Sequence, residues 1–279
     1  MTRPISLIAF AHCYRRSLGE TIGLATKAIT APDCAQMTLW KSKKSNPILA
    51  LLLLLAASLI GLLFLPPIPQ DQSYHAFADQ RTIFGVPNFW NVVSNIPFIA
   101  VGVVGLWQLR RNAAIDVLFL GILLTGFGSA YYHLNPNDGT LFWDRLPMAI
   151  SFMAILANAI EEQVDLKAGA VLLWPLIAVG VFSLLLWRWT GDLRLYGWVQ
   201  FFPAVALMLL FLLFPPAFSR TSLLVFAAAF YALAKLFEFF DQSIYSMGSI
   251  LSGHTLKHIA AAAACLVVLE YFKKRRPVV

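Results

Sequence analysis

Long apolar segments recur along the chain, and they restrict its possible folds more than any other feature. A helix that crosses a bilayer needs about 20 mostly apolar residues. By this criterion we predict eight membrane-spanning helices, at residues 47–65, 91–109, 115–133, 144–163, 168–187, 195–214, 221–240 and 250–272. Short connectors with helix-breaking residues separate them, such as PPIP at 66–69. The sequence therefore predicts an all-α polytopic transmembrane helix bundle.

The composition agrees with insertion into a membrane. With 59% hydrophobic residues, 13% charged residues and a mean hydropathy of +0.72, the chain carries more apolar surface than one soluble core can bury. The net charge of +7 comes from short Lys/Arg clusters beside apolar segments, so we expect no nucleic-acid partner. Cys13, Cys34 and Cys265 form no CxxC motif, which argues against a disulfide framework and a cysteine zinc site. Any bound metal must then use histidine or carboxylate.

The basic clusters also predict the orientation, because cytoplasmic loops carry an excess of Lys and Arg. If residues 41–44 are cytoplasmic, most other basic segments come to the same side: Arg110 and Arg111, Lys167, Arg220, and the tail at 273–276. We therefore expect both termini in the cytoplasm.

The N-terminal region leaves alternatives open. Residues 1–46 form no compact domain; they are either a cytoplasmic tail that can be disordered, or an upstream extension of a chain whose synthesis begins at Met37. The segment 47–65 is an uncleaved anchor or a signal peptide, and the lack of a small-x-small cleavage site after it favours the anchor. At the other end, 273–279 is expected to be a basic cytoplasmic tail.

Ionisable side chains inside the predicted spans point to function, because each costs about 2.5 to 3.5 kcal/mol to insert. His133 closes the third span, Asp144 opens the fourth, and His254 and His258 lie in the first two turns of the eighth. In the predicted orientation all four lie on the non-cytoplasmic side. His254 and His258 share a helix face, as do Ser129 and His133, because each pair is four residues apart.

Three imidazoles that leave one position open are typical of a catalytic zinc site. Such a site lowers the pKa of bound water to about 7, and Asp144 would be the available proton acceptor. Other interpretations compete with this one. His133 alone is more often an interfacial residue, and His254 with His258 can form a helix contact or include an axial haem ligand. Lys257 is expected to point away from the histidine face and to snorkel toward the headgroups.

Asp144 and Ser129 also have simpler interpretations. An acidic residue is favourable near a helix start, so Asp144 can form an interfacial pair with Arg145. Ser129 lies in a glycine-rich segment, where serine usually serves packing.

Four separated motifs resemble the successive signature segments of alkaline ceramidases: NFWNVVSNIPF at 88–98, GFGSAYYH at 126–133, LFWDRLPM at 141–148 and SGHTLKHIA at 252–260. That family belongs to a wider group of seven-helix membrane hydrolases and receptors, which includes the adiponectin and progestin receptors. The resemblance covers residues 74–272. It implies a seven-helix domain, preceded by one additional transmembrane helix at 47–65.

The resemblance implies a zinc ion held by His133, His254 and His258, with Ser129 and Asp144 at the same centre. It also implies cleavage of the ceramide amide to a sphingoid base and a fatty acid. The acidic cluster that binds calcium in animal members is reduced here to Asp71, Asp79 and Asn88, so a calcium site is doubtful.

Residues and resemblance together predict a zinc-dependent intramembrane amide hydrolase acting on ceramide or a related N-acyl lipid. The alternative is a zinc-containing seven-helix lipid receptor or sensor without turnover. A haem electron carrier and a transporter are weaker alternatives. The sequence leaves the lipid, the membrane and the oligomeric state open.

Overall fold

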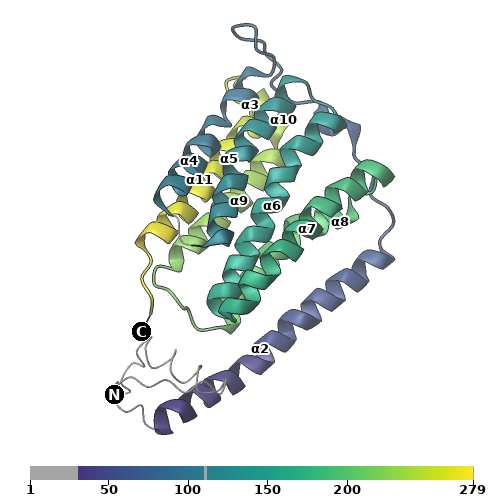
Figure 1. The fold of residues 1–279 in the computed structure, drawn as a ribbon. Helices are drawn as coiled ribbons and strands as arrows, with labels where there is room; N and C mark the ends of the chain where they lie inside the picture. Colours follow the sequence, from purple (N-terminus) through teal and green to yellow (C-terminus); the bar gives the residue numbers. More distant parts are fainter. Residues whose placement is uncertain (1–30, 110–111, 279) are drawn as a thin grey trace.

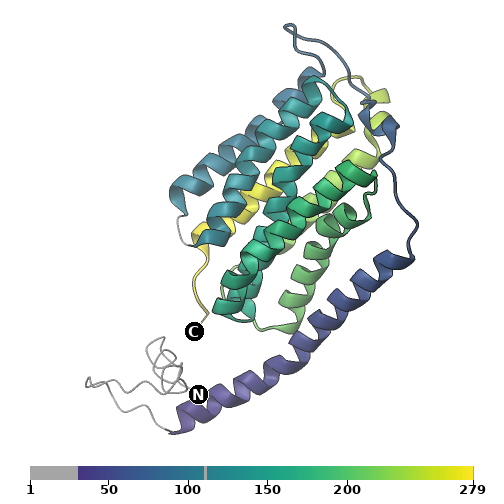
Figure 2. The ribbon, with the colours of Figure 1, turned by 45° about the vertical axis from the view of Figure 1, so that its right-hand side comes forward.

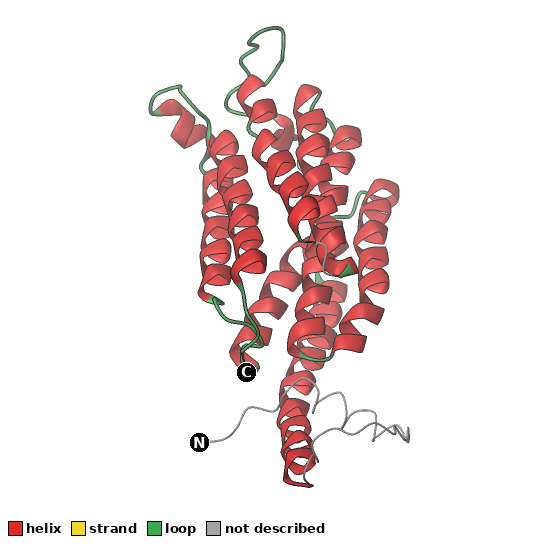
Figure 3. Cartoon of the chain, turned by 60° about the vertical axis from the view of Figure 1, so that its left-hand side comes forward, coloured by secondary structure: helices red, strands yellow, loops and turns green. Residues whose placement is uncertain are grey.

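The computed structural model describes residues 31–109 and 112–278, and within these ranges the chain is helices joined by loops and turns (Figure 3). Eight helices are long and apolar enough to cross a membrane, and they match the eight predicted spans. The protein is an all-α polytopic bundle and a multi-pass membrane protein. The predictions that concern residues 1–30, Arg110 and Arg111 lie outside the described residues.

The helices follow one another with short connections. The long ones are α2 (Ala31–Phe64), α4 (Ile96–Gln108), α5 (Ala113–Leu134), α6 (Asp138–Gln163), α7 (Leu166–Thr190), α8 (Arg194–Leu213), α9 (Ser222–Phe239) and α11 (Gly253–Lys274). Three short elements lie between them: η1 (Gln72–His75), α3 (Phe89–Val93) and α10 (Asp241–Ser246). The first span of the seven-helix part is divided, because α3 ends before Ser94 and α4 begins after Asn95, with Pro97 in its first turn.

Two helices begin six residues or more before the predicted spans. Helix α2 begins at Ala31 rather than at 47. Helix α6 begins at Asp138 rather than at 144, because Asn137 and Thr140 form a capping box: Thr140 N donates to Asn137 Oδ1 over 3.1 Å and Asn137 N to Thr140 Oγ1 over 3.2 Å. Asp144 therefore lies nearly two turns inside α6 rather than at its start.

Helices α4, α5, α6 and α7 pack in sequence order, and α11 closes the bundle against α9 and α4. Helix α2 runs along the edge of the bundle beside α8 (Figures 1 and 2). Trp198 Nε1 donates to Ser58 Oγ over 3.0 Å, and Arg194 Nη1 donates to the carbonyl oxygens of Leu62 and Leu65 over 3.2 and 2.6 Å. The described start of α2 and the end of α11 lie at the same end of the molecule (Figure 1).

The C-terminal residues pack onto the bundle instead of extending from it. Arg275 is buried, pairs with Glu162 over 2.5 Å and lies over the ring of Phe218, 4.1 Å from its centre. Ser219 N donates to the carbonyl oxygen of Arg276 over 2.8 Å. Part of the basic tail thus belongs to the packed end of the helix bundle.

Candidate metal centre

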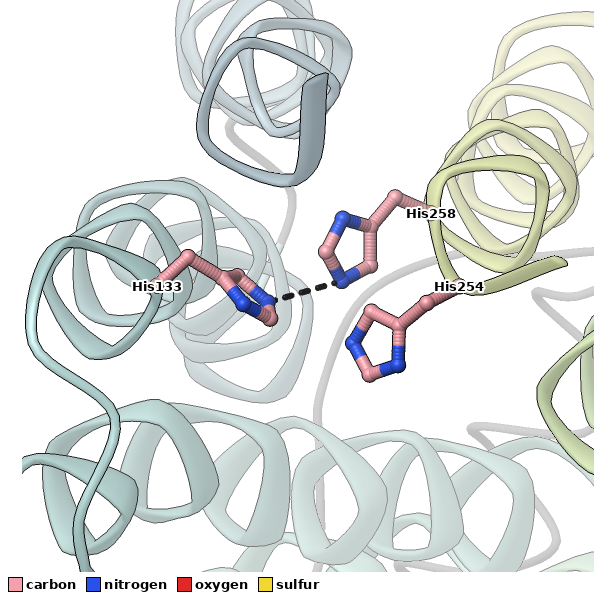
Figure 4. A group of neighbouring side chains, drawn as sticks. All are labelled: His133, His254 and His258. Carbon is pink, nitrogen blue, oxygen red and sulfur yellow. Dashed lines mark hydrogen bonds between the residues drawn. The ribbon is translucent and has the colours of Figure 1, made fainter. Parts of the chain in front are cut away.

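Three histidine side chains converge between α5 and α11 (Figure 4). His133 comes from the last turn of α5, and His254 and His258 come from the first two turns of α11. All three are buried, and one nitrogen from each lies within 4.8 Å of the other two. The predicted convergence of the three imidazoles is therefore present in the structure.

The spacing suits a small tetrahedral cation. Two nitrogens that bind one zinc ion at about 2.0–2.1 Å lie about 3.3 Å apart when the geometry is tetrahedral. The Nε2 atoms of His133 and His258 lie 3.2 Å apart. His133 Nδ1 is buried and has no hydrogen-bond partner among the described residues. Three nitrogen donors and a short separation of two of them fit zinc.

Neighbouring groups hold His258 in position. Ser94 Oγ lies 2.8 Å from His258 Nδ1 and donates to the carbonyl oxygen of Asn91 over 3.1 Å. Because the hydroxyl proton is used on Asn91, Ser94 accepts from Nδ1–H of His258. That tautomer leaves the lone pair of His258 Nε2 free to bind a cation. Asn91 also links α3 to α11, since Thr255 Oγ1 donates to Asn91 Oδ1 over 2.8 Å.

The start of α11 is anchored on both sides. Asp241 accepts from His254 N over 2.7 Å and from Ala78 N over 3.0 Å, so one carboxylate joins the helix to the loop before α3. Gly253 lies against α9, where an added Cβ would come 2.2 Å from the carbonyl oxygen of Phe237. The ring of Phe77 packs 4.6 Å from the rings of His133 and His254. These contacts set the depth and rotation of the two histidines on α11.

Ser129 and Asp144 meet where α5 contacts α6. A Cβ on Gly128 would lie 2.2 Å from the carbonyl oxygen of Trp143, so only glycine permits this approach. Ser129 and Asp144 are both buried, and the Ser129 hydroxyl lies near enough to the Asp144 carboxyl group to interact with it. Because Ser129 lies one turn before His133 on the same face of α5, Ser129 and Asp144 lie at the same end of the bundle as the three histidines.

The sequence missed a partly buried ion-pair network next to the histidines. Lys257 Nζ lies 2.6 Å from Glu238 Oε1 and 3.4 Å from His254 Nε2. Lys235 and Tyr74 also bond Glu238, over 2.8 and 2.9 Å. The prediction that Lys257 snorkels was wrong, because α9 packs along α11 and brings Glu238 within reach. A Lys and a Glu three residues apart inside the apolar segment of α9 were the available signal.

Arg145 does not pair with Asp144 as an interfacial couple. Among the described residues no carboxylate lies within 4.0 Å of its guanidinium. The side chain is buried against aromatic rings instead.

The residues considered for calcium are engaged separately. Asp71 Oδ1 accepts from Ser73 N over 2.9 Å, and Asn88 Nδ2 donates to the carbonyl oxygen of His133 over 2.9 Å. Arg81 Nη2 pairs with Asp79 Oδ2 over 2.6 Å. Burial acts to raise the pKa of Asp79, but the hydrogen bonds and charge of Arg81 outweigh it and hold that pKa below its usual value. A calcium site here stays doubtful.

The comparison with known families supports the family that the four sequence motifs resemble. The sequence profile of the ceramidase family matches residues 84–276. The chain belongs to the ceramidase family. The matched region contains the seven spans from α3 and α4 to α11 and all five predicted site residues, whereas α2 lies before it. No curated protein sequence matches the chain. Membership of the ceramidase family implies an amide hydrolase with a lipid substrate.

Proposed function

We propose that this ceramidase-family protein is a zinc-dependent intramembrane amidohydrolase. Its substrate is ceramide or a related N-acyl lipid, and its products are a sphingoid base or other amine and a fatty acid. The observation that carries the proposal is the buried convergence of His133, His254 and His258, with Ser129 and Asp144 buried at the same end of the bundle. A purely structural contact between helices would not need three imidazoles next to a carboxylate.

His133, His254 and His258 would hold the zinc ion. When bound, zinc supplies a Lewis acid that activates water and stabilises the oxyanion of a tetrahedral intermediate. Asp144 accepts a proton from the attacking water as the new C–O bond forms. It then gives the proton to the amide nitrogen as the C–N bond breaks, so the amine leaves neutral. Ser129 orients the Asp144 carboxylate through its hydroxyl group.

The position of the site suits a lipid amide. The histidines lie at the end of α5 and the start of α11, so the amide is cleaved near the headgroup level while the hydrocarbon chains remain among the apolar spans. As part of the proposal, residues 74–272 form the catalytic seven-helix domain and α2 is an addition to it. The basic segments favour cytoplasmic termini, which puts the site on the non-cytoplasmic side.

Two substitutions separate metal binding from proton transfer. His258→Ala removes a ligand, so we expect both bound zinc and turnover to be lost. Asp144→Asn removes the proton acceptor but no imidazole, so we expect zinc to stay and turnover to fall by about 10²- to 10⁴-fold. Metal analysis and fatty acid release from ceramide and other N-acyl lipids measure both effects. A chelator should remove turnover and added zinc should restore it.

Asp116→Asn is the matched control, because Asp116 is exposed in the first turn of α5, at the opposite end from His133. It should leave zinc and turnover unchanged. Full turnover in Asp144→Asn or in His258→Ala would refute the mechanism. Wild-type protein that binds zinc and ceramide without releasing fatty acid would instead support the lipid receptor or sensor.

A further inference from the structure

Arg145 is a buried cation that pairs with no carboxylate among the described residues. Arg145 is the residue after Asp144 in α6, and only 8% of it is exposed. The guanidinium carbon lies 4.9 Å from the ring centres of Trp187 and Tyr196 and 5.5 Å from that of Tyr74. Nη1 is fully buried and has no hydrogen-bond partner among the described residues.

Burying a guanidinium costs free energy unless hydrogen-bond acceptors satisfy its N–H groups. A guanidinium has five N–H donors in a fixed fork that matches carboxylate and phosphate groups. Aromatic faces attract a cation but accept no strong hydrogen bonds, so they compensate only part of the desolvation. Nη1 of Arg145 is therefore available for an acceptor that the described part of the chain does not supply.

The surroundings of Arg145 carry an excess of positive charge. Tyr74 lies between Arg145 and Lys257, with its ring centre 5.8 Å from Lys257 Nζ. Lys257 and Lys235 share one carboxylate, that of Glu238. Arg145 adds a third cation, and no carboxylate among the described residues lies within 4.0 Å of its guanidinium. The contact of Lys257 with His254 places this region directly beside the metal centre.

We propose that Arg145, with Tyr74, Trp187 and Tyr196 around it, forms a subsite for an anionic group on the amine portion of the substrate. The group is a carboxylate or a phosphate, so among the N-acyl lipids of the proposed function those with an anionic headgroup bind more tightly than neutral ones such as ceramide. The amine portion carries this group, because the acyl portion of an N-acyl lipid is a hydrocarbon chain. This inference rests on the proposed amide hydrolysis.

Three lipids with the same acyl chain test the subsite: N-palmitoylethanolamine, N-palmitoylglycine and the phosphate monoester of N-palmitoylethanolamine. Their headgroups carry a hydroxyl, a carboxylate and a phosphate. We measure the Kd of each lipid for the Asp144→Asn protein in detergent micelles, and kcat/KM for the wild-type protein. At least one anionic lipid should bind on the order of tenfold more tightly than the neutral lipid, and the tighter one identifies the group.

In proteins that also carry Arg145→Gln this preference should disappear, chiefly through weaker binding of the anionic lipid, while the neutral lipid binds as before. Arg145→Lys should retain part of the preference, because it keeps the charge and loses the fork. Arg188→Gln is the matched control, since Arg188 is an exposed arginine in the last turn of α7. It should keep the full preference.

Equal binding of all three lipids, or an equal loss for all three in Arg145→Gln, would overturn the subsite. The binding measurement does not depend on turnover. If the wild-type protein cleaves none of these lipids and no ceramide, the proposed hydrolase fails, and the Kd values still decide whether Arg145 recognises an anion.

Discussion

A single hydroxyl group holds one of the three candidate zinc ligands in place. Ser94 lies where α3 ends and α4 begins, and it bonds His258 Nδ1 over 2.8 Å. Neighbours of this kind set the tautomer and the orientation of a ligating imidazole. Ser94 therefore acts on a bound metal only through His258, as a positioning residue.

Ser94→Ala removes this bond and leaves His258 Nδ1 without its partner. We expect zinc affinity to fall by about 10- to 100-fold, with turnover recovered at high zinc concentration. Titration with zinc against a competing chelator measures the change. Ser183→Ala is the control, because Ser183 is equally buried but bonds only the Gly180 carbonyl oxygen within α7. Unchanged zinc affinity in Ser94→Ala would show that His258 is held by packing alone.

At the scale of elements, the contact between α5 and α6 brings Asp144, the proposed proton acceptor, to the end of the bundle that holds the candidate metal centre. Gly128 allows the backbones of the two helices to touch, and the capping box at Asn137 starts α6 early enough for Asp144 to face Ser129. The sequence showed the glycines and the asparagine but not the contact, because the close approach exists only once the two helices are packed.

Gly128→Ala should separate α5 from α6, since the new Cβ would lie 2.2 Å from the Trp143 carbonyl oxygen. We expect the free energy of unfolding to fall by about 1–3 kcal/mol. Turnover should fall more than zinc binding, because Ser129 and Asp144 shift while the three histidines stay. Thermal unfolding in detergent, metal analysis and fatty acid release provide the measurements.

Gly197→Ala is the matched control. Gly197 lies in α8, where an added Cβ meets nothing within 4 Å, so stability should be unchanged or slightly higher. If Gly128→Ala behaved in the same way, tight packing of α5 on α6 would not be needed for the site.

At the scale of the whole molecule, α2 stands outside the part that builds the site. It packs beside α8, and none of its 47–64 segment is buried in the bundle. The family match begins after it, at residue 84. The site is made by α3, α5, α6, α9 and α11.

Removal of residues 1–64 should therefore leave a folded seven-helix protein. We expect it to keep bound zinc and turnover, with an unfolding temperature lower by less than about 5 °C. Its start should move to the non-cytoplasmic side, because an odd number of spans then precedes a cytoplasmic C-terminus. Accessibility of tags at the two ends measures the orientation. Loss of zinc from a well-folded truncated protein would show that α2 supports the site after all.

The sequence by itself determined the eight spans, the family and the three histidines. Span length and the spacing of residues on one helix are local properties, so they can be read before folding. The confirmed convergence of His133 with His254 and His258 also depended on resemblance, since nothing local says that α5 and α11 are neighbours.

Only the tertiary structure decided which helices lie side by side, and with them the surroundings of the buried charges. The sequence suggested that Lys257 snorkels, but the packing of α9 places Glu238 against it. The sequence also suggested that Arg145 pairs with Asp144, but the structure surrounds Arg145 with the rings of Tyr74, Trp187 and Tyr196. The physical reason is that burial, and the choice of partner for a buried charge, depend on segments far apart in the chain that meet only when the bundle packs.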